Sequence, residues 1–180
     1  MQLNVYNKRT GIIFNTTNME TDKRKNYFDW DETFMQMCKV IANRSKDPNT
    51  QNGACIVNDK NIVIGLGYNG FPRGCGDGEL PWSREGDFCD TKYAYVVHAE
   101  ENAVLNSNAQ TEGTRMYCTL FPCNECAKVI IQKGIKEVIY ESDKYHDDDI
   151  WKVSRKMLDL AGITYRQYIT KNSLIFEKNK

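Results

Sequence analysis

The sequence lacks the features that would indicate a membrane protein, an exported protein or a nucleic-acid-binding domain. No apolar run approaches the roughly 20 residues that a transmembrane helix needs. The first residues, MQLNVYNKRTG, are not a basic segment followed by an apolar one, which argues against a secretory signal. The 24 basic and 24 acidic residues give a net charge of zero, so the usual electrostatic signature of nucleic-acid binding is absent. We therefore expect neither a membrane nor a nucleic acid as partner.

Cysteine is the residue type that stands out once these classes are set aside. The chain has seven cysteines, and without an export signal we expect them to be in the reducing cytoplasm. There, a C-x-x-C pair is typical of metal or redox chemistry rather than of a disulfide. The composition, with 41% hydrophobic and 27% charged residues over 180 positions, indicates a soluble chain large enough to bury a core.

We expect one folded domain at residues 28–168, with an N-terminal extension at 1–27 and a polar C-terminal tail at 169–180. The extension is rich in Asn, Thr and Lys, which is typical of flexible segments. Its apolar patches at Leu3–Tyr6 and Ile12–Phe14 leave two alternatives open, a short hairpin or a mobile tail.

Hydrophobic periodicity predicts the element order α-β-β-α-β-α-β-α-β within the domain. The first helix is capped by Asp29, with Glu32 at capping-box spacing, and ends before Asp47-Pro48 because the residue before a proline avoids the helical region. Strands are then predicted at 54–57 and 62–67, followed by a helix that begins at His98 and ends near Asn106–Asn108. A strand at 115–120, a helix from Pro122 closed by Gly134, a strand at 136–140, a helix at 147–161 and a strand at 163–168 complete the prediction.

Two of these helices carry apolar stripes that we expect to be buried. The stripe of the first helix is Trp30, Phe34, Met37, Cys38 and Ile41. The stripe of the last helix is Ile150, Val153, Met157, Leu160 and Ala161. Helical spacing of this kind is most simply explained by packing against a core.

The order of the elements also predicts the topology of the sheet. The first two strands, separated by Asn58–Asn61, form an antiparallel hairpin. Two strand–helix–strand crossovers then follow each other, and such crossovers require parallel pairing. We therefore predict an α/β fold, a three-layer α/β/α arrangement with a mixed five-stranded sheet that has its antiparallel hairpin first and its parallel strands in the second half.

A glycine-rich stretch follows the hairpin and leads into a long irregular segment. The stretch is GYNGFPRGCGDGE, and it is typical either of backbone that approaches a ligand closely or of a flexible strand exit. The irregular segment at 71–97 is longer than most loops, and loops of that length are usually functional. Cys75 and Cys89 lie within it, either as a second metal site or as plain thiols.

The chemistry is concentrated in H-A-E at 98–100 and P-C-N-E-C at 122–126. Cys123 and Cys126 lie three residues apart on the first turn of a helix, so both sulfurs face one way, and His98 begins another helix. These three side chains can hold Zn²⁺ and leave the fourth tetrahedral position open, which is typical of catalytic zinc. Glu100 is the acidic group that remains beside the metal, and it is our candidate proton acceptor.

A redox C-x-x-C, a structural zinc site and a chance match would each produce part of this motif. The proline before the pair and the unpaired H-A-E fit a redox motif poorly, and a structural zinc lacks a fourth ligand at the expected spacing. Residues i and i+2 do not share a helix face, so His98 and Glu100 converge only if His98 lies at or before the first helical position. We expect the neighbouring Glu101 to be turned away.

The chain from Phe28 to Tyr168 resembles the deoxycytidylate (dCMP) deaminases of the cytidine deaminase-like superfamily. Zinc deaminases in general share the H-x-E and P-C-x-x-C motif. The more specific resemblance lies in the segments DWDETFM, RSKDPNTQNGACIV, GYNGFPRGC, LPW, DTKYAYVVHAEENA, MYCTLFPCNECAKVIIQKGIKEVIY and SDKYHDDD. The resemblance implies the cytidine deaminase-like fold, a zinc cofactor, and hydrolysis of dCMP to dUMP, the precursor for thymidylate synthesis.

The resemblance also implies roles for individual residues. His98, Cys123 and Cys126 would bind zinc, and Glu100 would move protons. The substrate-binding groups would be the Ala99 backbone N–H at the pyrimidine carbonyl, Asn69 at the deoxyribose, and Ser45, Lys46 and Tyr145 at the 5′-phosphate.

Members of this family are typically oligomers, often hexamers, which dCTP activates and dTTP inhibits. By this resemblance the effector region would include Gly70, Arg73 and Gly74 together with the segment at 71–97. Two features depart from the family pattern. Glu101 stands where an apolar residue is expected in H-A-E-x-N-A, and the N-terminal extension is additional.

The sequence leaves further functions open. A deaminase of RNA or DNA bases shares the zinc motif, but the zero net charge and the lack of a basic–aromatic stripe argue against it. The helix at 147–161 and the phosphate-binding candidates argue against a free cytidine or cytosine deaminase. A deaminase of both dCTP and dCMP remains open. An inactive zinc module that senses nucleotides is the non-enzymatic alternative, and the presence of Glu100 argues against it.

Overall fold

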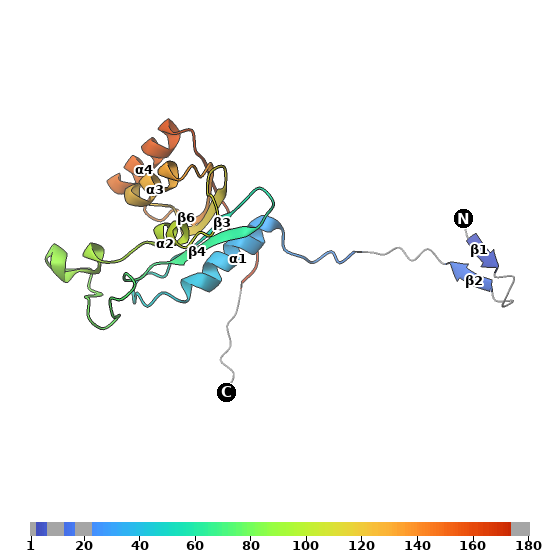
Figure 1. Ribbon diagram of the computed structural model, residues 1–180, viewed down its shortest axis with the longest axis horizontal. Coiled ribbons are helices and arrows are strands. Elements are labelled where there is room, and N and C mark those ends of the chain that lie inside the picture. Colours follow the sequence, from blue (N-terminus) through green and yellow to red (C-terminus); the bar gives the residue numbers. More distant parts are fainter. Residues whose placement is uncertain (1–2, 7–12, 17–22, 174–180) are drawn as a thin grey trace.

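The structure is a computed structural model that describes residues 3–6, 13–16 and 23–173 (Figure 1). Its elements follow the order predicted from the sequence, preceded by one short strand pair. They are β1 (Leu3–Tyr6), β2 (Ile13–Thr16), α1 (Trp30–Ala42), β3 (Gly53–Val57), β4 (Val63–Tyr68), α2 (Ala99–Leu105), β5 (Arg115–Leu120), α3 (Asn124–Gln132), β6 (Glu137–Ser142), α4 (Asp149–Leu160) and β7 (Thr164–Gln167). None of the helices within the described ranges combines the length and the apolar character needed to cross a membrane.

The two N-terminal strands pair with each other. β1 and β2 are antiparallel, with Leu3 opposite Thr16 and Tyr6 opposite Ile13. Of the two alternatives for the N-terminal extension, this pairing is the hairpin. Residues 7–12, between the two strands, lie outside the described part of the chain.

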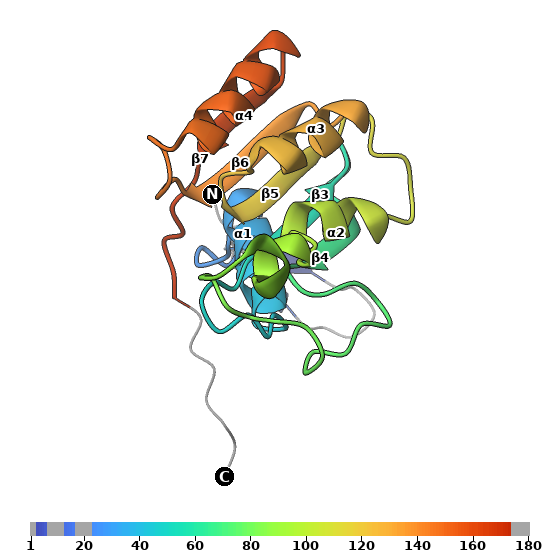
Figure 2. The ribbon, with the colours of Figure 1, turned by 90° about the vertical axis from the view of Figure 1, so that its left-hand side faces the viewer.

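The main sheet confirms the predicted topology. Its five strands lie in the order β4-β3-β5-β6-β7, and β3 is antiparallel to both β4 and β5 (Figure 2). β5, β6 and β7 run parallel, as the two crossovers through α3 and α4 require. The carboxyl end of β5 therefore leads directly to the N-terminus of α3.

Helices cover both faces of this sheet, as predicted (Figures 1 and 2). Side chains alternate along β3, so Cys55 and Val57 face α1 while Ala54 and Ile56 face α2 and α3. β3 is buried along its whole length because both of its faces are covered. The core thus has two halves, one on each side of the central strand.

Glycines in two strands allow the helices to approach the sheet closely. A Cβ built on Gly67 of β4 would lie 2.2 Å from the Ala103 nitrogen and 2.2 Å from the Ala99 oxygen of α2. A Cβ on Gly53 of β3 would lie 1.9 Å from the Cys38 oxygen of α1. Gly67 therefore serves helix packing and not ligand approach, and it places the start of α2 against the sheet.

The predicted buried stripe of α1 is partly wrong. Phe34 and Cys38 are buried as predicted, but Met35 is buried in place of Met37, which is only partly buried. Trp30 is 56% exposed, and its ring stacks on Phe34 with the two centroids 5.4 Å apart. At the first position of the helix, Trp30 lies beyond the edge of the sheet and covers Phe34 from outside.

The predicted stripe of α4 is wrong except at Met157, which is partly buried and packs against the core. Ile150, Val153 and Leu160 are exposed, whereas Leu158 and Ser154 are buried. The Ser154 hydroxyl donates a hydrogen bond to the Pro122 carbonyl at 2.8 Å, which turns this polar side chain inward. The indole N–H of Trp151 donates to the Phe121 carbonyl at 3.0 Å in the same way. These two bonds rotate α4 away from its apolar stripe, and they satisfy backbone carbonyls that would otherwise be buried without partners.

Asp29 caps α1 as predicted, but Glu32 does not complete a capping box. The Asp29 carboxylate accepts a hydrogen bond from the Glu32 N–H at 2.7 Å. The Glu32 carboxylate is 1% exposed and accepts hydrogen bonds from Gln36, Tyr168 and the backbone N–H groups of Lys171 and Asn172. The residues just after β7 are therefore held against α1, although their composition predicts a polar tail.

This arrangement predicts a pH-dependent contribution of Glu32 to stability. Burial opposes ionisation, but the hydrogen bonds outweigh it and lower the pKa of Glu32 to about 2, from an ordinary value of 4.5. A lowered pKa stabilises the fold fully above about pH 4.5, and the stabilisation is lost as the pH falls towards 2. We expect Glu32→Gln to lower the free energy of unfolding by about 2–3 kcal/mol at pH 6.

The test is denaturant unfolding of both proteins at pH 6 and pH 3.5. The difference between wild type and variant should narrow by about 1 kcal/mol at the lower pH, because wild-type Glu32 is then partly protonated on unfolding. Asp59→Asn, at an exposed carboxylate in the β3–β4 turn, is the matched control and should show no such difference. If wild type and variant differ by the same free energy of unfolding at both pH values, Glu32 is not ionised in the folded protein.

Candidate functional site

The metal-ligand candidates come from the N-termini of two neighbouring helices. His98 is the N-cap of α2, with an extended backbone (φ −73°, ψ 160°), so it precedes the first helical turn as the i, i+2 argument required. Cys126 lies in the first turn of α3. Cys123 is the N-cap of α3 and not part of its first turn, since the helix begins at Asn124 and not at Pro122. Even so, both sulfurs face the histidine.

The spacing of these three side chains fits a zinc ion. The Nδ1 atom of His98 lies 3.3 Å from the Cys123 sulfur and 3.4 Å from the Cys126 sulfur. Tetrahedral zinc with bonds of about 2.0–2.3 Å places its nitrogen and sulfur ligands roughly 3.5 Å apart. All three ligand atoms lie within 4.8 Å of one another, and among the described residues this is the one His/Cys/Asp/Glu group with metal-binding geometry. The residues present therefore fit zinc.

The three ligand candidates shift one another's pKa values. Hydrogen bonds from Cys126 and then from His98 outweigh burial and lower the pKa of Cys123 to about 4. The hydrogen bond with Cys123 raises the pKa of His98 to about 9. The bond with Cys123, together with burial, raises the pKa of the Cys126 thiol. Metals bind the thiolate form of cysteine and the neutral form of histidine, so zinc binding at this cluster would release the protons of Cys126 and His98.

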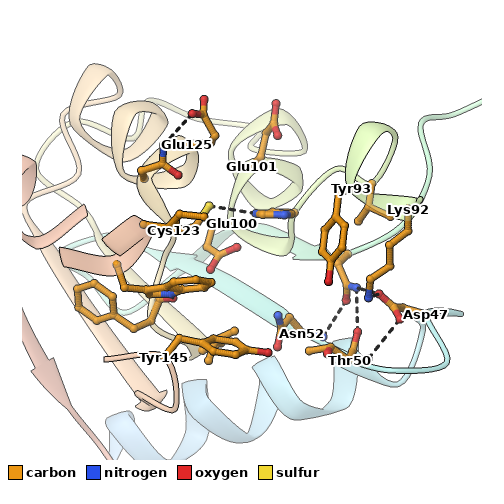
Figure 3. Close-up of a pocket in the computed structure, with 18 of the residues that line it drawn as sticks. Asp47, Thr50, Asn52, Lys92, Tyr93, Glu100, Glu101, Cys123, Glu125 and Tyr145 are labelled. Atoms are coloured by element: carbon orange, nitrogen blue, oxygen red, sulfur yellow. Dashed lines mark hydrogen bonds and ion pairs between the residues drawn. The ribbon is translucent and has the colours of Figure 1, made fainter. Parts of the chain in front are cut away.

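Glu100 lies beside this cluster without being one of its ligands. It is on the first turn of α2, is 5% exposed, and its Oε2 atom lies 3.5 Å from the Cys126 sulfur. Burial raises the pKa of the Glu100 carboxyl. A buried carboxyl with a raised pKa exchanges protons more readily near neutral pH. Glu101 points away from Glu100 in Figure 3, as predicted.

A cavity of about 700 Å³ opens in front of the cluster (Figure 3). His98, Glu100 and Cys123 line one end. The rest of the lining comes from the loop before β3, the residue after β4, the segment at 71–97, the end of β5, α3, and the start of α4 with the residues before it. The lining residues used below are Asp47, Thr50, Asn52, Asn69, Arg84, Lys92, Tyr93, Tyr145 and Trp151.

A buried ion pair holds two sides of this cavity together. Lys92, from the segment at 71–97, pairs with Asp47 in the loop before β3, and both are buried. Asp47 also accepts hydrogen bonds from the backbone N–H groups of Asn49 (2.8 Å) and Thr50 (3.3 Å). Because a buried charge is costly without its partner, this pair couples the long segment to the loop that lines the cavity.

The two ends of the segment at 71–97 are joined by a backbone bridge, directly before His98. Gly70 and Val97 exchange two backbone hydrogen bonds, of 3.1 and 2.9 Å. Apart from two 3₁₀ turns, at Phe88–Asp90 and Lys92–Ala94, the segment between them has no regular structure. This bridge and Gly67 together set the position of His98.

The predicted substrate-binding residues separate into two groups. Asn69 and Tyr145 line the cavity, and Ala99 occupies the first position of α2, where a backbone N–H has no helical partner. Ser45 and Lys46 do not line it. The Ser45 hydroxyl donates to the Asn69 carbonyl at 2.8 Å, and the Lys46 ammonium pairs with Asp77.

The predicted effector residues lie outside the cavity lining. Gly70 forms the bridge to Val97, Arg73 donates a hydrogen bond to Asn106, and Gly74 adopts a positive φ of 89°. Cys75 and Cys89, the candidates for a second metal site, are exposed free thiols. Neither belongs to the metal-ligand group found within the described residues.

Sequence reasoning missed several residues that line the cavity, above all Arg84, Lys92, Asp47 and Asn52. Arg84 donates a hydrogen bond to the Tyr93 hydroxyl at 3.0 Å. Lys92, Asp47 and Asn52 lie in the segments DTKYAYVVHAEENA and RSKDPNTQNGACIV, which carry the family resemblance, but the sequence does not indicate that these side chains line a cavity. An internal charge pair cannot be recognised from two residues that are 45 positions apart.

The site has three candidate zinc ligands at the N-termini of two helices and a buried carboxyl beside them, and the fold has a mixed sheet between two layers of helices. This combination is typical of a zinc-dependent deaminase. Comparison with known families makes this more specific. The family model described as "Cytidine and deoxycytidylate deaminase zinc-binding region" matches residues 28–142. The chain belongs to this family.

The similar proteins agree with this membership. The chain is 56% identical to the deoxycytidylate deaminase of Pongo abelii over 155 residues, which is 85% of this chain and 87% of the relative. It is 55% identical to the human deoxycytidylate deaminase over 155 residues, with the same coverage. Among solved structures it resembles the dCMP deaminase of the cyanophage S-TIM5 in complex with dCMP and dUMP. That likeness has a TM-score of 0.62 and 26% identity, and it covers 76% of this chain and 95% of the other.

Proposed function

We propose that this protein removes the amino group of dCMP by hydrolysis, releasing dUMP and ammonia and thereby supplying thymidylate synthesis. The observation that carries the proposal is the buried Glu100 carboxyl, 3.5 Å from the Cys126 sulfur, at the end of a nucleotide-sized cavity. The names of the relatives and the dCMP and dUMP in the S-TIM5 structure support this choice of substrate.

The residues of this chain divide the reaction between them. Zinc, when bound by His98, Cys123 and Cys126, lowers the pKa of water and so supplies a nucleophile at neutral pH. Glu100 takes one proton of the attacking water and passes it to the pyrimidine ring nitrogen. It then takes the remaining proton of the added hydroxyl and gives it to the amine, which leaves as ammonia while the carbonyl forms. The Ala99 N–H, which has no helical partner, donates to the pyrimidine carbonyl and so orients the ring.

The 5′-phosphate binds at Arg84 and Tyr145, which both line the cavity. Apart from His98, the cationic side chains among the described lining residues are Arg84 and Lys92. Lys92 is already paired with Asp47, whereas no carboxylate within the described part of the chain forms an ion pair with Arg84. Arg84 therefore replaces Lys46 as the phosphate-binding cation. Ser45 acts indirectly, through its bond to the Asn69 carbonyl.

Assembly and regulation complete the proposal. We propose a cytoplasmic homo-oligomer, in which dCTP activates and dTTP inhibits. The exposed apolar side chains Ile150, Val153 and Leu160 on α4 support an association surface, because contiguous apolar surface is usually covered. Activation and inhibition rest on the family resemblance, and adding each nucleotide to the assay below tests them.

We expect Arg84→Gln to impair the reaction of dCMP selectively. A charge-assisted hydrogen bond contributes about 1.5–3 kcal/mol, so kcat/KM for dCMP should fall roughly 10- to 100-fold. The kcat/KM for deoxycytidine, which has no phosphate, should change less than about threefold. Steady-state kinetics with both substrates gives the comparison.

Lys46→Gln is the matched control, since this exposed cation lies outside the cavity lining. A selective loss of dCMP activity in Lys46→Gln, with none in Arg84→Gln, would return the phosphate role to Lys46. The wild-type protein should also prefer dCMP in a panel with dCTP, CMP, cytidine and single-stranded DNA. A preference for single-stranded DNA, or no turnover of any of them, would overturn the proposed function.

A further inference from the structure

Asn52 lies in the cavity, at the residue before β3, and no part of the reaction described above uses it. It lines the cavity together with Glu100 and Tyr145. Figure 3 shows the Asn52 side chain directed into the cavity, in the space between Glu100 and Thr50. This position lies between the place of the pyrimidine ring and the place of the phosphate.

A hydrogen-bonded chain sets the orientation of the Asn52 amide. The Gly53 N–H donates to the Thr119 hydroxyl oxygen at 3.1 Å, and the Thr119 hydroxyl donates its own proton to Asn52 Oδ1 at 3.3 Å. The Thr119 hydroxyl has only one proton to donate, and among the described residues its acceptor is Asn52 Oδ1. The amide oxygen of Asn52 therefore faces Thr119, and its Nδ2 group faces the cavity.

The backbone of Asn52 is held on both sides by Asn69. The Asn52 N–H donates to Asn69 Oδ1 at 2.8 Å, and the Asn69 N–H donates to the Asn52 carbonyl at 3.3 Å. A side chain on such a fixed backbone is preorganised, so less conformational entropy is lost when a ligand binds to it.

The Asn69 amide, which the family resemblance assigns to the deoxyribose, is already engaged within the protein. Its Nδ2 group donates to the Thr50 carbonyl at 2.9 Å and to Asp47 Oδ2 at 3.4 Å, and its Oδ1 atom accepts from Asn52. Both amide hydrogens of Asn69 thus have acceptors. In contrast, Asn52 Nδ2 has no acceptor within the described residues.

We propose that Asn52 is a substrate-binding residue, whose Nδ2 group donates a hydrogen bond to an oxygen of the deoxyribose 5′-phosphate portion of the nucleotide. The group can only donate, and the sugar and phosphate oxygens are the acceptors that lie between the pyrimidine ring and Arg84. Asn69 acts as a positioning residue, holding the backbone of Asn52 in place. This inference rests on the proposed function.

The test compares Asn52→Leu, which keeps the volume but removes the donor, with Asn52→Asp, which replaces the donor by an anion. We expect Asn52→Leu to raise KM for dCMP about 5- to 20-fold with little change in kcat. Asn52→Asp should raise KM about 100-fold, because its carboxylate repels the phosphate, and it should affect deoxycytidine much less. Asn108→Leu, at an exposed asparagine outside this cavity, is the control and should behave as wild type.

A second measurement keeps the test independent of turnover. The affinity of dUMP, measured by calorimetry in a Glu100→Gln background, should weaken by a similar factor when Asn52→Leu is added. If KM and dUMP affinity both stay within twofold of wild type, Asn52 does not bind substrate. If kcat falls equally for dCMP and deoxycytidine with unchanged dUMP affinity, its role is structural and the proposal is overturned. Failure of wild type to deaminate dCMP would instead overturn the proposed function.

Discussion

Glu100→Gln is expected to lower kcat for dCMP by about 10³- to 10⁴-fold while leaving zinc bound. General acid–base catalysis contributes up to about 10⁴-fold, and Glu100 is the buried carboxyl next to the ligand cluster. Glutamine has nearly the same shape, so the cavity and the three metal ligands keep their positions. It can neither accept the proton of water nor return a proton to the departing amine.

The measurement is steady-state kinetics on dCMP combined with the zinc content of the purified variant. Glu101→Gln is the matched control, because it neutralises the adjacent carboxyl that points away from Glu100 (Figure 3). We expect Glu101→Gln to change kcat less than about tenfold. A Glu100→Gln variant with near-wild-type kcat would show that another group moves the proton.

Cys126→Ala is expected to lose the metal. Its turnover of dCMP should therefore fall by at least about 10³-fold. Its sulfur is 2% exposed and lies 3.4 Å from His98 Nδ1, so the remaining pair of ligands cannot complete a zinc site. Metal-binding energy is also folding energy, since the unfolded chain offers no preformed site. The variant should therefore melt at a lower temperature than wild type, as should wild-type protein treated with a chelator.

Elemental analysis, thermal unfolding and dCMP turnover measure the three effects. Cys75→Ser is the control, because Cys75 is an exposed free thiol outside the ligand cluster. It should keep zinc, activity and melting temperature. Should Cys126→Ala retain stoichiometric zinc, the ligand set His98, Cys123 and Cys126 would be wrong, whatever its activity.

The zinc site could be predicted because each part of it depends on local geometry. Cys123 and Cys126 are three residues apart at a helix start, so any helix that begins there brings their sulfurs to one side. His98 and Glu100 are compatible only if His98 precedes the helix, and the structure has it as the N-cap. The sheet topology was predictable for a similar reason, since crossovers between parallel strands allow few alternatives.

The nucleotide-binding end of the cavity could not be predicted in the same way. Lys46 and Arg84 are both cations near glycine- or proline-containing loops, and spacing does not distinguish them. The structure pairs Lys46 with Asp77 away from the cavity, and it brings Arg84 to the lining from the long segment at 71–97. That segment has no hydrophobic period, so its path depends on contacts such as the Lys92–Asp47 ion pair.

The order of the elements, the topology of the main sheet and the three residues that fit zinc could be predicted from the sequence. Periodicity and spacing are properties of neighbouring residues, and they suffice for these features. Tertiary contacts determine which face of α4 is buried, which cation lines the cavity and which amide has an unpaired donor among the described residues. Asn52 and Asn69 are both asparagines beside the cavity, and hydrogen bonds to distant residues alone leave one with an available donor and the other without.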